Sequence, residues 1–292
     1  MSFIRPLFRL ISHYLVAVAL LVHAAIVSAG ALEQLFAPSA DLWDVWQAHR
    51  ADSAQRIDHG RWDRFLANNV QRGEDGINRI GYESVSQADR HALQIYLSAM
   101  QAVPVSDHNR DEQLAYWINL YNALTVDVVL RHYPVESIRD IDISPGLFAD
   151  GPWGKTLLTI EGREVSLNDI EHRILRPIWK DARVHYAVNC ASLGCPNLQQ
   201  RAYSANDINM QLDSAARDYV NHPRGVRVEG QELYVSSIYS WFQVDFGQTE
   251  AEVIRHLQIH AAPELAKQLE DIKFFTDDHY DWSLNSLTGH AQ

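Results

Sequence analysis

Residues 111–134, DEQLAYWINLYNALTVDVVLRHYP, decide the fold, because a helix drawn over them is apolar nearly all round. The apolar run extends from Leu114 to Leu130, and a helix that is hydrophobic on every side is a buried one. Pro134 follows and ends the helical pattern. We therefore expect a central helix with the remaining elements packed around it.

A polar seam interrupts this apolar helix. Asn119, Asn122 and Thr125 recur at every third residue and so lie on one side of the helix. Buried amides need hydrogen-bond partners. The seam therefore either binds the backbone of neighbouring segments or forms one wall of a polar pocket.

The segments around this helix alternate between helical and extended patterns. Helical periodicity or capping signals cover residues 62–70, 86–103, 166–179, 204–221, 237–247, 249–261 and 263–270. Residues 156–166 and 226–236 read as β-hairpins, and 183–190 and 272–276 as strands. Because this order lacks regular βαβ alternation, it predicts an α+β single domain, with helices packed around a small mixed or antiparallel sheet with two β-hairpins.

The N-terminus predicts export. Arg5 and Arg9 precede an apolar stretch from about Tyr14 to Val27, and small residues follow, as in a cleavable signal peptide over residues 1–30. The alternative is an uncleaved anchor, but the stretch is shorter than the ~20 residues of a spanning helix. We expect a periplasmic or secreted protein with no stable membrane insertion after cleavage. The predicted boundaries are a helical or extended segment over 31–81, a core domain over 82–287 and a disordered tail over 288–292.

Composition and motifs exclude several functions. The net charge of −12 argues against nucleic-acid binding, which needs a basic patch. The sequence has no HExxH, no CxxC, no phosphate-binding loop and no GxSxG, so we predict no metal, no cofactor and no serine nucleophile. A small-molecule or peptide ligand remains.

Several blocks resemble a known family. Residues 115–141, 166–176, 184–198, 237–247 and 280–285 are similar to the family catalogued as domain of unknown function 547, and the similarity runs from about Trp62 to Asn285. The chain looks like the exported proteobacterial branch. The resemblance brings no established reaction with it. It implies Cys at position 190 and either Cys or Ser at position 195, so a disulfide would not be the family-wide purpose of Cys190.

Both cysteines of the chain, Cys190 and Cys195, lie in RVHYAVNCASLGCPNL, residues 183–198. An oxidising compartment favours a bridge, and the four residues between them form a turn that can close one. A reversible redox pair is the weaker alternative, since thioredoxin-like pairs have two intervening residues. The third interpretation is catalytic, with Cys190 as nucleophile of an amide or thioester hydrolase or acyl transferase.

The catalytic interpretation requires a base and an orienting group. His172 and His185 are the candidate bases, and Glu171, Asp281 or Asn119 could orient them. Strand alternation puts His185 and Cys190 on opposite faces, which favours His172 as the base. We expect one cavity to collect the catalytic candidates Cys190, His172, His185 and Glu171 and the binding candidates Asn119, Asn122, Asn189 and Asp281. The alternative to an enzyme is a binding or scaffold domain with a structural Cys190–Cys195 disulfide.

Overall fold

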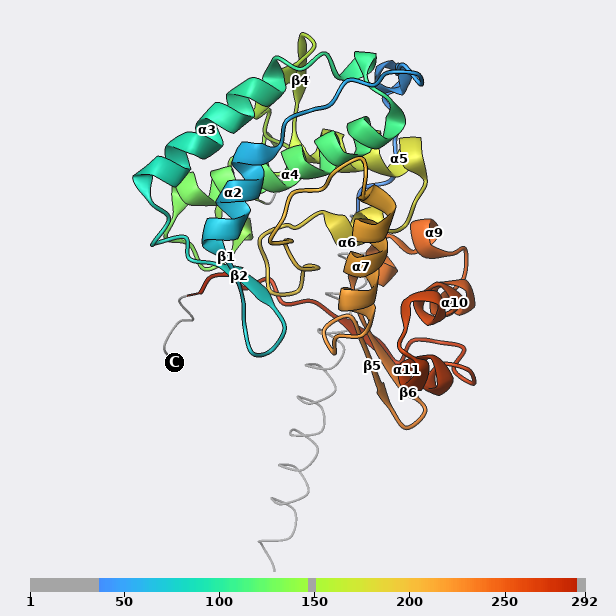
Figure 1. Cartoon of the computed structure of the whole chain (residues 1–292). Coiled ribbons are helices and arrows are strands. Elements are labelled where there is room, and N and C mark those ends of the chain that lie inside the picture. The colour runs from blue at the N-terminus through green and yellow to red at the C-terminus, as the bar shows by residue number, and fades with distance from the viewer. Residues whose placement is uncertain (1–36, 147–150, 288–292) are drawn as a thin grey trace, which may run out of the picture.

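The computed structural model describes residues 37–146 and 151–287 as an α+β domain of helices with small sheets (Figure 1). The predicted signal peptide, 1–30, and the predicted tail, 288–292, lie outside the described residues. The α-helices are α2 (Gly60–Asn69), α3 (Gln87–Gln101), α4 (Arg110–His132), α5 (Arg176–Trp179), α6 (Val184–Ala187), α7 (Ile208–Val220), α8 (Ile238–Trp241), α9 (Gln243–Phe246), α10 (Glu250–His260) and α11 (Pro263–Gln268). Shorter turns are η1 (Asp44–Gln47), η2 (Val105–Asp107) and η3 (Ile138–Asp140), and η4 (Asp169–Leu175) is π-helical.

Helix α4 is the predicted central helix. Every residue from Glu112 to Leu130 is buried. The side chain of Asn109 accepts a hydrogen bond from the Glu112 N–H and so caps the first turn. In Figure 1, α4 runs behind α2. Within the described residues, no helix is both long and apolar enough to cross a bilayer.

Two hydrophobic clusters form the interior. The first surrounds α2, α3, α4 and η4 and contains the fully buried Trp62 and Trp117. The second lies among α7, α8, α10 and the strands β5 (Val226–Glu229) and β6 (Glu232–Ser236), and it includes Tyr186, Tyr219 and Tyr239. In Figure 1, α2 and α3 of the first cluster lie at the upper left and α10 of the second cluster lies at the lower right, with α6 and α7 between them. A cavity between the two clusters can therefore be lined by residues from both.

The strands form three small sheets. The pairs β1 (Val70–Arg72) with β2 (Asn78–Ile80) and β3 (Leu158–Ile160) with β4 (Arg163–Val165) are antiparallel. The third sheet is mixed, because β5 (Val226–Glu229) pairs antiparallel with β6 (Glu232–Ser236), which pairs parallel with β7 (Asp277–His279). The two predicted hairpins are confirmed as β3–β4 and β5–β6.

Two strand predictions are wrong. Residues 183–190 contain the helical turn α6, and the chain becomes extended only at Val188. All four residues of α6 are buried, so the alternation of apolar residues there carried no information on which side faces the core. The strand predicted over residues 272–276 begins at Asp277 instead. Thr276, just before it, donates its N–H to Leu233 O at 2.7 Å and so starts the pairing with β6.

The last described segment crosses back over the molecule. We call residues 280–287 the C-terminal strap. Its backbone hydrogen bonds join it to Ile80, to Glu136 and to the cysteine-containing turn, at Ala191, Leu193 and Gly194. The strap thereby connects three segments that are far apart in the sequence.

Candidate functional site

A cavity of about 580 Å³ lies where the two hydrophobic clusters meet, and we call it the sulfur cavity. Its walls come from α4, η4, α6, the cysteine turn, α8 and the strap. The aromatic part of the wall consists of Tyr121, Trp153, Trp241, Phe242, Tyr280 and Trp282. Its polar part includes Glu171, His172 and His185, and both cysteines lie on its surface. Apolar walls with a few convergent polar groups are typical of ligand sites.

The two cysteines form a disulfide, with their Cα atoms 6.2 Å apart. The Tyr280 hydroxyl lies 3.0 Å from Cys190 Sγ and donates to Cys195 Sγ at 3.1 Å. Ser192 donates in turn to the Tyr280 oxygen at 3.0 Å, which leaves the phenolic hydrogen free for sulfur. Burial raises the pKa of Tyr280 well above its usual value, so its hydroxyl stays protonated. The bridge therefore has a fixed hydrogen-bond donor beside both sulfur atoms.

The cysteine turn needs glycine at position 194. A Cβ atom there would lie 2.8 Å from the backbone nitrogen of Asp281 in the strap, closer than real Cβ contacts. The bare backbone instead lets Gly194 N–H donate to Asp281 O at 2.8 Å. This close approach brings Tyr280, the neighbour of Asp281, against the disulfide.

His185 comes from α6 and is held by a carboxylate. Its Nε2 is 2.7 Å from Asp245 Oδ2, and the ring stacks on Phe242 at a centroid distance of 4.6 Å. Burial alone would raise the pKa of Asp245, but hydrogen bonds from His185 and Arg176 outweigh it and lower the pKa to about 2. An ionised carboxylate only accepts hydrogen bonds. Nε2 therefore carries the hydrogen, and in the neutral ring the lone pair is on Nδ1, 3.9 Å from Glu171 Oε1.

His172, on η4, has the opposite arrangement. Arg176 Nη1 lies 3.0 Å from His172 Nδ1, and because a guanidinium only donates, Nδ1 is the acceptor. Burial lowers the pKa of His172 to about 4, although the neighbouring Glu171 opposes this shift. The ring is therefore neutral at pH 7 with its hydrogen on Nε2. Such an imidazole can donate a hydrogen bond but cannot accept a proton at Nε2.

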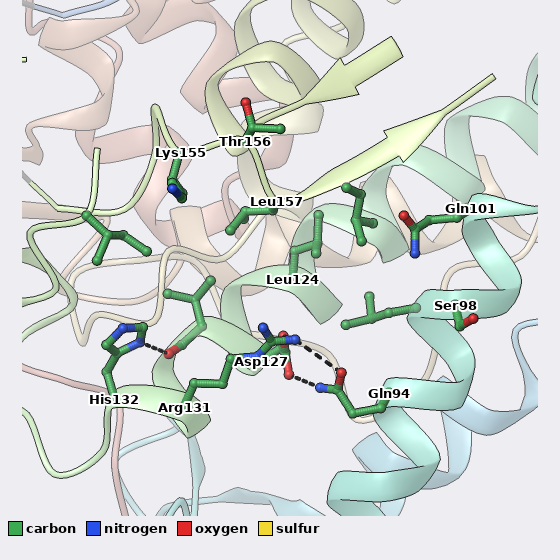
Figure 2. A pocket seen from close by; sticks show the side chains of 14 residues that line it. Gln94, Ser98, Gln101, Leu124, Asp127, Arg131, His132, Lys155, Thr156 and Leu157 are labelled. Carbon is green, nitrogen blue, oxygen red and sulfur yellow. Dashed lines mark hydrogen bonds and ion pairs between the residues drawn. The ribbon is translucent and has the colours of Figure 1, made fainter. Parts of the chain in front are cut away.

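Another cavity, of about 390 Å³, lies between α3, α4 and the segment before β3 (Figure 2). Its buried carboxylate, Asp127, is bound by Gln94 and forms an ion pair with Arg131 at 2.7 Å. Its histidine, His132, uses Nδ1 on the Val128 carbonyl oxygen at 2.9 Å. These groups are occupied with one another, so this cavity offers less for chemistry than the sulfur cavity. Over residues 37–146 and 151–287 no cluster of side chains is suited to hold a metal ion.

Residues 105–220 match the family model described as "Protein of unknown function, DUF547". The chain contains a DUF547 domain. No curated protein and no solved structure was found to match the chain. The matched residues of the DUF547 domain include η4, α6 and both cysteines, whereas Asp245 and the strap follow after them.

Within and beside the DUF547 domain, the predicted catalytic residues come together. Cys190, Cys195, Glu171, His172 and His185 all line the sulfur cavity. The predicted obstacle to His185, that it faces away from Cys190, disappears because α6 is helical at His185.

The predicted binding residues do not line this cavity. Asn119 binds the backbone N–H and C=O of Tyr203, at 2.9 and 2.8 Å. Asn122 binds Ala187 O and Asn189 N in the same way. The side chain of Asn189 bonds to Pro196 O and Ala191 N, and that of Asp281 accepts from Ser283 N. The two amides of the α4 seam thus bind neighbouring backbone, the first of the two alternatives, whereas the Thr125 hydroxyl has no hydrogen-bond partner among the described residues.

Three functional residues were missed by sequence reasoning: Asp245, Arg176 and Tyr280. Arg176 Nε donates to Asp245 Oδ2 at 2.5 Å, and its side chain is only 1% exposed. The available signal was a charge in an apolar setting, since Asp245 lies within the aromatic run SIYSWFQVDFG and Arg176 within a core helix. A buried charge needs a partner, and here each is the partner of the other.

Proposed function

We propose that this protein is a cysteine-dependent hydrolase or acyl transferase acting on amide or thioester bonds, with Cys190 as its nucleophile. The observation that carries the proposal is the shared lining of the sulfur cavity by Cys190, two imidazoles and Glu171. Cys190 is the better candidate of the two sulfurs because it is half-buried, whereas Cys195 is only 4% exposed.

The resting disulfide has to be reduced first by an external dithiol, which takes up the oxidation as its own disulfide. Cys190 then gives its proton to His185 Nδ1 and attacks the carbonyl carbon. The C–N or C–S bond of the substrate breaks, the leaving group takes the proton, and water hydrolyses the acyl-enzyme. Asp245 orients His185 and stabilises the imidazolium, and His172 Nε2–H donates to the developing oxyanion. The base is thus His185, in contrast to the preference from sequence.

A second candidate function is ligand binding without chemistry. The formed disulfide favours it, because a bridged sulfur is not a nucleophile. The aromatic wall would then bind the ligand, and the bridge would only fix the cysteine turn.

Alkylation kinetics separate the two functions. The Cys195→Ser variant frees Cys190 without reductant, and Cys190→Ser is the matched control that leaves only Cys195. For a catalytic thiol, iodoacetamide should label Cys190 with a pH midpoint below the ~8.5 of an ordinary thiol. Both His185→Gln and Asp245→Asn should raise that midpoint. A midpoint at or above the ordinary value, unchanged by either variant, would exclude the catalytic function and leave the binding function.

We also infer that the protein is exported to the periplasm or secreted. The charged and apolar pattern of residues 1–30 supports this, as does a disulfide, which persists in oxidising compartments. Cell fractionation and N-terminal sequencing of the mature protein test it. Cytosolic protein that retains residues 1–30 would contradict it.

A further inference from the structure

The aromatic wall of the sulfur cavity indicates the class of substrate. Trp153, Trp241 and Trp282 line the cavity and are half-buried. By contrast, Trp62 and Trp117 of the first cluster are only 1% exposed. Part of each ring on the wall is therefore not covered by protein. Covering apolar surface is favourable in water, so these rings favour an apolar partner.

The aromatic wall begins at the proposed nucleophile. The Tyr280 hydroxyl lies 3.0 Å from Cys190 Sγ. The Tyr280 ring contacts Trp241 and Trp282, at centroid distances of 4.8 and 4.7 Å. Trp153 follows beyond Trp282, at 5.8 Å. A substrate whose carbonyl carbon is at Cys190 can therefore lay its acyl group along these rings.

The aromatic wall is poorly suited to a cation. The Arg176 guanidinium already lies over Phe242, with Cζ 4.6 Å from the ring centroid. Arg139 lies over Trp282 in the same way, at 5.2 Å. Cation–π attraction at those ring faces is therefore used within the protein. Trp241 and Trp282 are stacked at 5.7 Å, a contact distance for rings, so no ammonium group fits between them.

An anionic ligand is disfavoured by the polar part of the wall. Glu171 lines the cavity and is only 7% exposed. A ligand carboxylate would place a second acidic group in the same enclosed space, and like charges that share a site oppose each other's ionisation. A neutral acyl group avoids this cost.

We propose that the substrate is a thioester or amide with an uncharged, apolar acyl group, which lies on Tyr280, Trp241 and Trp282. Because Cys190 is taken as the nucleophile, this assignment rests on the proposed function. The cavity volume of about 580 Å³ is that of a small-molecule site, so the substrate is a small molecule and not a folded protein.

Stable amides test the ligand class without any reaction. The probes are N-ethyl-4-phenylbutanamide, the anionic N-ethylsuccinamate and the cationic N-ethyl-4-(trimethylammonio)butanamide. The oxidised parent protein is used, because its bridged Cys190 cannot attack. In isothermal titration calorimetry, the phenylbutanamide should bind at least about tenfold more tightly than either charged amide.

Trp241→Ala removes part of the aromatic wall and should weaken binding of the phenylbutanamide about tenfold. Trp241→Phe keeps a smaller ring and should have an intermediate affinity, which also covers the case that Trp241→Ala does not fold. Trp179→Ala is the matched control, since Trp179 is half-buried but lies outside the cavity. It should bind the phenylbutanamide as the parent does.

Four outcomes would overturn the proposal. They are no binding of the phenylbutanamide at millimolar concentration, equal or tighter binding of the cationic amide, equal or tighter binding of the succinamate, which would point to Arg139, and unchanged affinity in both Trp241 variants. Failure of the proposed function is distinguishable from these. In that case the alkylation midpoint of Cys190 is ordinary while the phenylbutanamide still binds, which would support the apolar ligand class for the binding function.

Discussion

The amide seam of α4 and the imidazole cluster around Asp245 are both polar groups inside the protein, but they are used differently. Asn119 and Asn122 each spend their donor and their acceptor on the backbone of another segment. The imidazole cluster retains an unused hydrogen-bond acceptor, because His185 Nδ1 accepts no hydrogen bond from the described residues. Both His185 and His172 also line a cavity. A saturated buried polar group fixes structure, and one with an unused atom at a cavity is available for chemistry.

The largest expected loss of stability comes from removing an amide of the α4 seam. Asn119→Ala leaves the backbone N–H and C=O of Tyr203 without partners in the interior. We expect the free energy of unfolding to fall by about 2–4 kcal/mol, since each unsatisfied group costs ~1–3 kcal/mol. Urea denaturation measures it. Asn68→Ala, whose surface amide bonds to Asp89, is the control and should change stability by less than ~0.5 kcal/mol.

Asn119→Ala, combined with Cys195→Ser, tests whether the amide seam and the imidazole cluster are independent of each other. The alkylation rate of Cys190 should then be unchanged, because the seam acts on structure alone. A slower rate would mean that the seam and the cluster are coupled.

The next effect concerns pH. Because the pKa of His172 is about 4 in the folded state and 6.5 in an unfolded chain, the unfolded state binds a proton first as the pH falls. The contribution of this group to stability is therefore fully present above pH 6.5 and is lost between pH 6.5 and 4, on the order of 3 kcal/mol at 1.36 kcal/mol per pKa unit.

His172→Gln should flatten the pH dependence of stability in that window. Urea midpoints measured at several pH values test it, with His91→Gln on the exposed surface of α3 as the control. Equal slopes in the parent and His172→Gln would show that the ring is not buried as a neutral group.

The smallest effect concerns the donor beside the bridge. Tyr280→Phe removes the hydroxyl that donates to sulfur, and this hydroxyl stabilises the thiolate that leaves when the bridge is reduced. Reduction by dithiothreitol should be slower by about three- to tenfold, which corresponds to roughly one hydrogen bond. Tyr116→Phe, which loses a hydrogen bond to Met100 O away from the bridge, is the control. Identical reduction rates of all three proteins would contradict a role for Tyr280.

Sequence patterns predicted the elements whose periodicity is set by burial, such as α4, α10 and the two hairpins. They also predicted that Glu171, His172 and Cys190 share a cavity, because an acid on a core-facing stripe demands a partner. They failed at α6, where every side is buried and alternation has no meaning. They could not find the partners of His185 and Arg176, since Asp245 is 60 and 69 residues away and only the tertiary fold brings it near.

The C-terminal strap has a consequence for the order in which the protein assembles. Tyr82 donates to Asn285 Oδ1 across 203 residues of sequence, whereas the two cysteines are only five residues apart. Contacts between distant segments form slowly, because long loops must close first. A folding chain can therefore pair its cysteines before the strap brings Tyr280 and Trp282 to the cavity wall. The disulfide can therefore form early in folding, and the wall of the sulfur cavity is completed last.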